Sequence, residues 1–417
     1  MGHIGVFCPN SPGHLNPMVA LADATRARGH RVTFFLLGDP PSSVAAAGFE
    51  IISLGESVFP PDEYRAGLQR LGTLQGRAAL THTFSMGRRS AEATLEVGPT
   101  AVRSVGVTAL LVDQASLSGG TVADQLGLPF ATVCNALLLH SDPAAPPFFT
   151  HWQPRDTRWA RLRNQIAWAG LNRMYAPILT LIQERRRQLG LPVPERITGT
   201  WSDRLQVSQQ PELFEFPRRD LPKQVRFVGP LRLPGGYQPV SFPWERLDGR
   251  PLIYASLGTL QNRIGGTFRV IAEACEGLDV QLVISTGHGV TPEALGELPG
   301  RPVVVPYAPQ LDLLARSTVA VTHAGLNTVL DALATGIPMV AVPVANEQPG
   351  IAARVAWVGA GEAIAHERLT AQTLRAAVVR VQTDQAYRAA AELIRDSIRA
   401  GGGAPRAAEM IEQGLVP

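Results

Sequence analysis

The residues with the clearest chemical potential lie in the segment VTHAGLNTVLDALATG, residues 321–336. Its apolar start predicts a strand that runs into His323 and Gly325, and the pattern that follows predicts a helix beginning near Leu326. Gly325 lets a ligand approach the backbone closely. The free amides and the macrodipole of a helix start favour an anion, and His323 can add a donor. The segment therefore predicts a cradle for a diphosphate.

The predicted helix carries two polar residues on one further face. Asn327 and Asp331 lie four residues apart, so their side chains share that face. The carboxylate of Asp331 can accept hydrogen bonds from ribose hydroxyls. Because strand–glycine–helix turns occur throughout α/β proteins, the segment alone leaves a purely structural role open.

Residues after neighbouring predicted strands favour a binding site. Upstream, Tyr307 offers an aromatic ring for base stacking and Gln310 an amide for a base edge. Downstream, Glu347 and Gln348 offer a carboxylate and an amide for hydroxyl groups. Since each group follows a separate strand of one sheet, we expect all of them to open on the same sheet edge.

A second candidate group lies in the first part of the chain. His14 follows the first predicted strand, and Asp113 ends the fourth, ALLVD. In the common doubly wound order these strands are neighbours, so the two side chains should lie close together. The carboxylate would fix the tautomer of His14 and leave Nε2 as a general base. The alternatives are an ordinary polar histidine and an aspartate that caps a helix or anchors a loop.

Two alternations of apolar strands and helices must position these residues. We predict strands at 4–8, 32–37, 50–54, 109–113, 130–134 and 205–208, and then at 252–256, 281–285, 303–306, 319–322 and 339–342. Nearly continuous apolar strands between helices are typical of parallel strands buried on both faces. The predicted fold class is α/β, with two doubly wound, Rossmann-like parallel-sheet domains facing each other across a cleft.

A proline-rich stretch separates the two parts. Eight of the 41 residues from 211 to 251 are proline, against an average usage of about 5%. Proline is excluded from helix interiors and central strands, so we interpret the stretch as an extended linker. The predicted first domain spans 1–228, the linker 229–248 and the second domain 249–393. Residues 394–417 are expected to form a helix that packs back on the first domain.

Composition excludes several classes of protein. With 45% hydrophobic and 18% charged residues, the 417-residue chain is not largely disordered. Its net charge of +3 argues against a nucleic-acid partner. The three cysteines lie far apart, and we find neither a signal-peptide pattern nor an apolar run of about 18 residues. These features favour a cytoplasmic location.

Three segments together resemble the donor-binding signature of the UDP-glycosyltransferases of family 1. They are APQ at 308–310, HAGLNTVLDAL at 323–333 and EQ at 347–348. The C-terminal half, including YASLGTLQNR at 254–263, resembles the bacterial zeaxanthin glucosyltransferases in particular. The resemblance implies a GT-B fold, in which the first domain binds the acceptor and the second binds a nucleotide sugar.

The resemblance also implies a contact for each donor-side residue. His323, Asn327 and Thr328 would contact the diphosphate, and Ser256, Gly258 and Thr259 would lie beside the phosphates. Gln310 would contact the uridine and Asp331 the ribose. Glu347 and Gln348 would contact the donor sugar. Tyr307 stands where the plant signature has tryptophan. Asp331 stands where the family has glutamate, and Glu347 where it usually has aspartate. Each keeps the negative charge but differs in side-chain length by one methylene, which leaves sugar selectivity open.

The two candidate groups together imply transfer of a sugar to a hydroxyl. His14 would take the proton as the acceptor oxygen attacks the anomeric carbon, while the helix start and His323 would stabilise the departing UDP. A single displacement inverts the anomeric centre, so UDP-glucose would give a β-glucoside. The chain has no Asp-x-Asp motif and no GxGxxG after its first strand, so we expect neither a metal nor a cofactor.

The sequence defines the acceptor less well. We expect a lipophilic hydroxylated small molecule, first a carotenoid such as zeaxanthin, and second a macrolide, another polyketide or a phenolic compound. A nucleotide-sugar epimerase or binding protein on the same fold is the remaining alternative. The stretches 82–86 and 148–152, interpreted as loops, carry residues able to line a pocket. The basic, tryptophan-bearing segment 152–163 fits a solvated helix or peripheral contact with the inner face of an anionic membrane.

Overall fold

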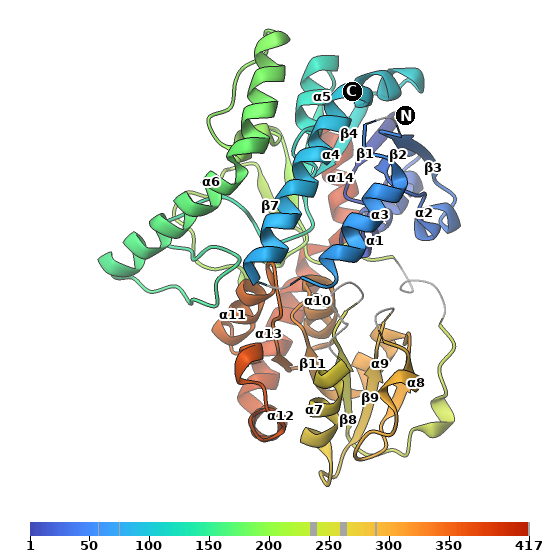
Figure 1. The fold of residues 1–417 in the computed structure, drawn as a ribbon, viewed down its shortest axis with the longest axis vertical. Coiled ribbons are helices and arrows are strands. Elements are labelled where there is room, and N and C mark those ends of the chain that lie inside the picture. The colour runs from blue at the N-terminus through green and yellow to red at the C-terminus, as the bar shows by residue number, and fades with distance from the viewer. Residues whose placement is uncertain (57, 75, 234–239, 259–264, 288–289, 416–417) are drawn as a thin grey trace.

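The structure is a computed structural model of the chain, and it describes all residues except 57, 75, 234–239, 259–264, 288–289 and 416–417. The described residues form two lobes, each built on a parallel β-sheet between helices (Figure 1). The first sheet has seven strands in the order β3-β2-β1-β4-β5-β6-β7, and the second has six in the order β10-β9-β8-β11-β12-β13. Both orders reverse at a central strand, so both sheets are doubly wound. The predicted fold class is confirmed.

All eleven predicted strands occur within two residues of their predicted ends. The strands of the first sheet are β1 (His3–Phe7), β2 (Arg31–Leu37), β3 (Glu50–Leu54), β4 (Ala109–Asp113), β5 (Phe130–Cys134), β6 (Gln206–Ser208) and β7 (Val225–Phe227). Those of the second are β8 (Leu252–Ser256), β9 (Gln281–Ser285), β10 (Val303–Val305), β11 (Ser317–Thr322), β12 (Met339–Ala341) and β13 (Gly361–Ala363).

Two short edge strands are absent from the prediction. β7 lies inside the proline-rich stretch that we interpreted as an extended linker, and it pairs with β6. That interpretation is wrong for 225–227, because proline is tolerated beside an edge strand. β13 reads Gly-Glu-Ala and contains no β-branched or aromatic residue. β13 therefore owes its conformation to pairing with β12 rather than to intrinsic propensity.

The helices alternate with the strands in both lobes. Those of the first lobe are α1 (Pro12–Ala27), α2 (Ser42–Ala46), α3 (Pro61–Leu71), α4 (Gly76–Ser104), α5 (Gly119–Leu126) and α6 (Arg158–Gln188). Those after the linker are α7 (Gly265–Cys275), α8 (Pro292–Leu295), α9 (Gln310–Arg316), α10 (Leu326–Thr335), α11 (Gln348–Trp357), α12 (Ala371–Thr383), α13 (Gln385–Gly401) and α14 (Gly403–Leu415). Short 3-10 turns occur at η1 (Ile197–Thr200), η2 (Glu212–Phe214), η3 (Trp244–Arg246) and η4 (His366–Arg368).

The first sheet is buried on both faces. Val6 of β1 packs with Met18 of α1 on one face. Phe7, the next residue, points to the other face and stacks on Phe35 with ring centroids 5.4 Å apart. Because successive strand side chains alternate between faces, both faces need apolar residues. This double burial explains the nearly continuous apolar runs and fixes the strand ends that carry the site.

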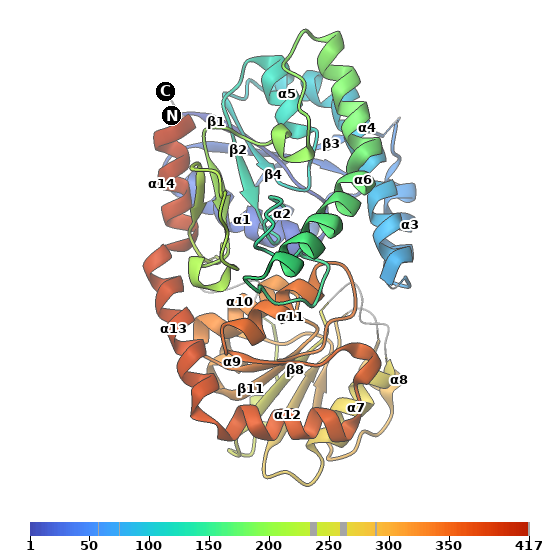
Figure 2. The same ribbon diagram turned by 90° about the vertical axis from the view of Figure 1, so that its left-hand side faces the viewer.

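The two C-terminal helices cross from the second lobe to the first (Figure 2). α13 packs against α10, and α14 packs against α1. Ile411 of α14 shares the buried core of the first lobe with Leu15. Gly401 permits the crossing, because a Cβ there would lie 2.5 Å from the carbonyl oxygen of Val228. The chain end therefore ties the two lobes together.

The lobes also meet beside α11. Arg354 of α11 forms an ion pair of 2.5 Å with Glu215, which follows β6, and both side chains are buried. The Arg354 guanidinium lies 4.1 Å from the ring centroid of Phe216. A Cβ on Gly350 would lie 2.1 Å from the carbonyl oxygen of Phe148. Separating the lobes would leave each of these two charges without its partner, and a buried charge without a partner is costly. These contacts therefore favour closely apposed lobes.

Candidate active site

A cavity of about 730 Å³ lies between the carboxyl ends of the two sheets. His14 of α1 and residues after β4 line its first-lobe wall, and turns of the second lobe line the other. The donor-side residues of the prediction that lie in the described part of the chain all line this cavity: Ser256, Gly258, Tyr307, Gln310, His323, Gly325, Asn327, Thr328, Asp331, Glu347 and Gln348. The remaining one, Thr259, lies outside the described residues.

His14 and Asp113 form a hydrogen-bonded pair on the first-lobe wall. Nδ1 of His14 lies 2.8 Å from Oδ2 of Asp113. This proximity follows from the topology, since β1 and β4 are adjacent parallel strands. The buried Asp113 carboxylate also accepts hydrogen bonds from the Asn135 side-chain amide at 2.8 Å and from the Ala115 amide at 2.7 Å. These donors fix the carboxylate, and Nε2 of His14 is left for the cavity.

The surroundings of His14 favour its charged form. Burial by itself would lower the pKa of His14, but the charge and hydrogen bond of Asp113, together with the charge of Glu347, outweigh it and raise the pKa. Glu347 belongs to the opposite lobe, and burial raises its own pKa. His14 thus has an acidic neighbour from each lobe, and both stabilise the protonated imidazole.

The second histidine of the cavity has the opposite environment. His323 follows β11, and burial lowers its pKa to about 4, against a backbone hydrogen bond with Ser256. Gly258 and Gly325 leave room for the ring, because a Cβ on either would lie 2.6 Å from the imidazole. At neutral pH His323 is therefore uncharged, so it can offer a diphosphate a hydrogen bond but no positive charge.

The start of α10 has the geometry of an anion cradle. Gly325 is its N-cap residue, and no side chain caps this helix start. Ala324 has φ of +63°, in the left-handed region that side chains disfavour. Thr328 in the first turn lines the cavity. Uncapped amides and the positive end of the helix dipole are what an anion binds.

Asn327 contacts the opposite lobe in this structure. Its side-chain amide donates to the carbonyl oxygen of Gly13 at 3.1 Å. Its own oxygen accepts a hydrogen bond from the side chain of Gln209 at 3.0 Å. The first turn of α10 therefore joins the lobes at the cavity, and Gln209 carried no signal in the sequence.

The part of the cavity around Gln310 and Asp331 contains a hydrogen-bonded network that the sequence only half predicts. The Gln310 amide donates to Oδ2 of Asp331 at 2.7 Å, and the Tyr254 hydroxyl donates to Oε1 of Gln310 at 3.4 Å. Arg232 of the linker places Nε 3.3 Å from Oδ1 of Asp331. The structure brings Gln310 and Asp331 together as predicted residues, whereas Arg232 and Tyr254 are additions.

One wall of the cavity in the first lobe is mainly apolar. It consists of side chains from β3, α3, α4 and α6, namely Leu54, Leu68, Leu71, Leu80, Phe84, Met86 and Ile178. The stretch 82–86 is a turn of α4, so its interpretation as a loop was wrong. Of the two stretches expected to line a pocket, Phe84, Met86 and Phe148 do so. The histidine, aspartate and glutamate residues among the described lining residues belong to other elements of the two lobes: His14, His323, Asp331 and Glu347.

Other chemical features of the described residues are few. Within them, no group of three or more histidine, cysteine, aspartate or glutamate side chains could hold a metal ion. The helices of this same part of the chain are too short or too polar to cross a bilayer. Cys8, Cys134 and Cys275 are buried without a disulfide, and burial raises the pKa of each thiol.

Solved structures with this architecture define the class of protein. CalG4, the calicheamicin glycosyltransferase, matches over 100% of both chains with a TM-score of 0.77 and 23% identity. The glycosyltransferase of kitacinnamycin matches over 99% of both chains with a TM-score of 0.76 and 26% identity. Two doubly wound lobes around a shared cleft therefore give this chain the GT-B fold of these glycosyltransferases.

Sequence relatives narrow the class to one family. Zeaxanthin glucosyltransferase of Pseudescherichia vulneris is 32% identical over 100% of this chain and 98% of its own length. The 4'-demethylrebeccamycin synthase of Lentzea aerocolonigenes is 29% identical over 97% of both chains. The family model UDP-glucoronosyl and UDP-glucosyl transferase matches residues 210–396. The chain belongs to this family and is a UDP-sugar hexosyltransferase.

Proposed function

We propose that the protein transfers glucose from UDP-glucose to a hydroxyl of a lipophilic small molecule, with inversion at the anomeric carbon. The observation that carries this proposal is the contact of 2.8 Å between His14 and Asp113, opposite a wall that holds the donor-side residues. The first domain, 1–228, would bind the acceptor, and the second, 249–393, the donor. Residues 229–248 would link them, and 394–417 would return to the first domain.

His14 is the general base of the proposed reaction. Its Nε2 accepts the proton as the acceptor oxygen bonds to the anomeric carbon and the bond from that carbon to the phosphate oxygen breaks. The electron pair leaves with UDP. Asp113 stabilises the imidazolium and fixes its tautomer. The α10 amides and His323 stabilise the charge that gathers on the diphosphate.

The remaining donor contacts follow the resemblance. Asn327 and Thr328 bind the diphosphate at the start of α10, while Ser256, Gly258 and Thr259 lie beside the phosphates. Tyr307 and Gln310 face the base, and Asp331 accepts from the ribose. Glu347 and Gln348 contact the donor sugar. The lining of one cavity by the described members of this set supports these roles.

A carotenoid is the proposed acceptor. The mainly apolar wall of the cavity, from α3, α4 and α6, suits a long hydrocarbon. The relative from Pseudescherichia vulneris is a zeaxanthin glucosyltransferase. A macrolide, another polyketide or a phenolic compound is the second candidate, which the demethyllactenocin mycarosyltransferase of Streptomyces fradiae, 28% identical, supports.

Product analysis tests the proposed reaction. The protein is incubated with UDP-glucose, UDP-galactose or UDP-glucuronic acid and with zeaxanthin, a macrolide or a flavonoid. We expect a mass gain of one hexose on zeaxanthin with UDP-glucose, and a β-linkage by NMR. Transfer to the macrolide alone would favour the second acceptor class. An α-linked product or formation of an epimeric UDP-sugar would refute the mechanism.

We also propose that the protein works in the cytoplasm against the inner face of the membrane, through the start of α6. Trp159, Leu162 and Ile166 lie on one face of this helix and are 74%, 46% and 64% exposed. Arg155 and Arg158 lie beside them in the chain, and this charge suits an anionic bilayer.

Vesicle sedimentation tests this contact. The full chain should sediment with phosphatidylglycerol vesicles more than with phosphatidylcholine vesicles, and the double variant W159S/I166S should lose this binding. Leu393→Ser is the matched control, because Leu393 is 62% exposed on a different helix, α13. Equal sedimentation of the double variant and the unaltered chain would refute the contact.

A further inference from the structure

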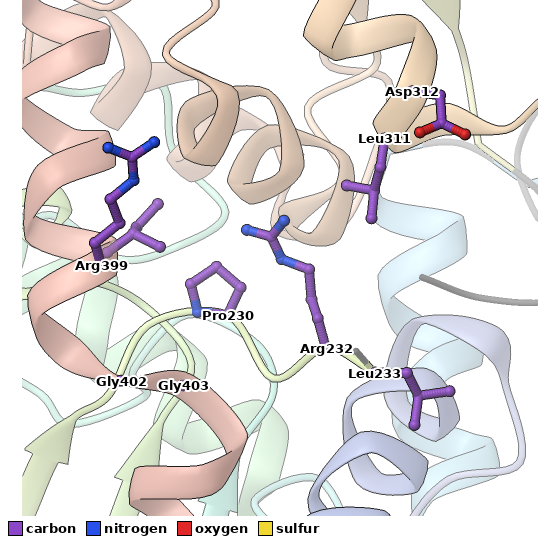
Figure 3. Close-up of a pocket in the computed structure, with 9 residues that line it drawn as sticks. Pro230, Arg232, Leu233, Leu311, Asp312, Arg399, Gly402 and Gly403 are labelled. Carbon is purple, nitrogen blue, oxygen red and sulfur yellow. The ribbon is translucent and has the colours of Figure 1, made fainter. Parts of the chain in front are cut away.

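Arg232 belongs to the linker but is anchored in the first lobe. Leu231 and Leu233 on either side of it pack against the core that β1 and α1 share. In extended backbone, successive side chains point in opposite directions. Arg232 therefore points away from that core, and Figure 3 shows it reaching from the chain between Pro230 and Leu233 toward the helices of the second lobe.

The partner of Arg232 in the second lobe is Asp331. Nε of Arg232 lies 3.3 Å from Oδ1 of Asp331, and the two side chains are 21% and 6% exposed. Arg232 also lines a second cavity of about 470 Å³, across which Arg399 lies on α13 (Figure 3). Asp331 lines the cavity between the lobes. The ion pair thus separates the active-site cavity from the cavity at the linker.

We propose that Arg232 is a positioning residue of the nucleotide site, which holds the Asp331 carboxylate ionised and aimed at the ribose hydroxyls when the lobes are closed. This inference rests on the proposed function. Because Arg232 is anchored in the acceptor lobe and Asp331 lies in the donor lobe, separating the lobes would remove the charge partner of a buried carboxylate. Nucleotide binding would then be coupled to lobe closure.

The buried carboxylate needs such a partner. An ionised carboxylate in a water-poor site is costly unless it is paired and hydrogen-bonded. Gln310 bonds to Oδ2 and Arg232 to Oδ1, and a carboxylate has about four acceptor positions. Acceptor capacity therefore remains for ribose hydroxyls.

The protonation of Asp331 depends on this pair. Burial raises the pKa of Asp331, while the charge of Arg232 and the hydrogen bond from Gln310 lower it. Tyr254, from β8, also faces this carboxyl, and burial raises its pKa to about 12. From α13, Arg395 approaches Gly336, past the end of α10. Without Arg232, the pKa of Asp331 would therefore lie higher still.

A second contact supports the coupling to lobe closure. Asn327, one helical turn before Asp331, bonds to Gly13 and Gln209 of the first lobe. Residues four apart share one helix face, so a single face of α10 carries both contacts. Closed lobes would complete this face, and open lobes would leave Asn327 and Asp331 without these partners.

Calorimetry with UDP and 2′-deoxy-UDP tests the proposal on the full chain. Arg232→Met is the main variant, and Arg232→Lys restores a positive charge. Arg399→Met is the matched control. Arg399 is 70% exposed, and its Nη1 lies 3.8 Å from Oδ1 of Asp396, so its charge partner is a different carboxylate. Each variant is compared with the unaltered chain at the same pH, so titration of the nucleotide cancels.

We expect R232M to weaken UDP binding about tenfold at pH 7, the scale of one charge-assisted hydrogen bond. It should weaken 2′-deoxy-UDP less, so the preference for UDP shrinks. The loss should diminish as the pH rises, because the raised pKa of Asp331 makes its carboxyl ionise at higher pH. R232K should retain most of the affinity and R399M all of it.

Two patterns would overturn the assignment. Unchanged UDP affinity in R232M would remove Arg232 from the site while leaving the proposed function intact. An equal loss for both nucleotides that does not vary with pH would show a structural role only. If R232M does not fold, R232K is compared with the unaltered chain. A loss of UDP affinity of about tenfold in R232K, which keeps the positive charge, would contradict the charge argument. No UDP binding by the unaltered chain would refute the proposed function itself.

Discussion

The two histidines of the cavity occupy comparable places in their lobes, since each follows a central strand of a doubly wound sheet. His14, after β1, has a raised pKa, because Asp113 and Glu347 outweigh its burial. His323, after β11, has a pKa lowered to about 4 by burial. Connections from a strand to a helix therefore bring an imidazole with a raised pKa to one side of the cleft and an uncharged imidazole to the other. The neighbouring carboxylates make the difference.

The largest expected effect is on the first of these histidines. His14→Ala should lower turnover at least about a hundredfold, the usual contribution of a general base. UDP binding should change little, because the donor-side residues lie on the opposite wall. Steady-state kinetics and calorimetry measure the two quantities. His151→Ala is the control, since His151 is exposed and does not line the cavity. Near-normal turnover of H14A would remove His14 from its proposed role.

Asp113→Asn should make the two histidines more alike. The change keeps the size of the side chain but removes the charge that raises the pKa of His14. Turnover should fall roughly 10- to 100-fold, and the acid limb of the pH profile of kcat/KM should move to lower pH. An unshifted acid limb would mean that Asp113 does not set the basicity of His14.

The donor side of the comparison is tested at α10. Asn327→Leu replaces a side-chain amide that lines the cavity with an apolar group of similar size. The hydrogen bonds to Gly13 and Gln209 are lost with the amide. We expect UDP affinity to fall about five- to tenfold, the scale of one hydrogen bond. Thr335→Val, at the far end of the same helix, is the control. Unchanged affinity by calorimetry in N327L would contradict the proposed cradle.

A smaller effect concerns charge at His323. If its imidazole is uncharged, UDP-glucose affinity should stay nearly constant between pH 6 and 8, because a pKa of about 4 lies well below this range. The kcat/KM profile should still show an acid limb, which belongs to His14. A loss of UDP-glucose affinity as the pH rises from 6 to 8 would indicate a charged His323 instead.

The strands and the central pairings could be predicted because parallel strands buried on both faces must be apolar along their whole length. The same reasoning placed His14 beside Asp113, at the ends of neighbouring strands. The helical course of 82–86 could not be predicted in this way. The segment HTFSMG has weak helix formers, and packing of α4 against α3 and α6 holds the helix.

Contacts between the lobes lie beyond sequence reasoning for a different cause. Arg232 and Gln209 belong to segments far from α10 in the chain, and their partners depend on how the two lobes dock. Neither residue belongs to a pattern, because the linker and the loop after β6 have no period. The shared lining of one cavity wall by residues that follow the strands of a single sheet could be predicted from the strand order, whereas the contacts between the lobes could not.

The smallest expected effect separates the two carboxylates around His14. Glu347 raises the pKa of His14 from across the cleft, after the larger contribution of Asp113. Glu347→Gln removes that charge but keeps the size of the side chain and an acceptor oxygen, so the acid limb of kcat/KM should move to lower pH, by less than in D113N. Because His14 must be uncharged to accept a proton, the variant should lose less activity than the unaltered protein as the pH falls. Turnover at pH 8 should change only a few-fold, the scale of one weakened hydrogen bond. A shift as large as that of D113N would mean that the second lobe sets the basicity of His14 as strongly as the first lobe does.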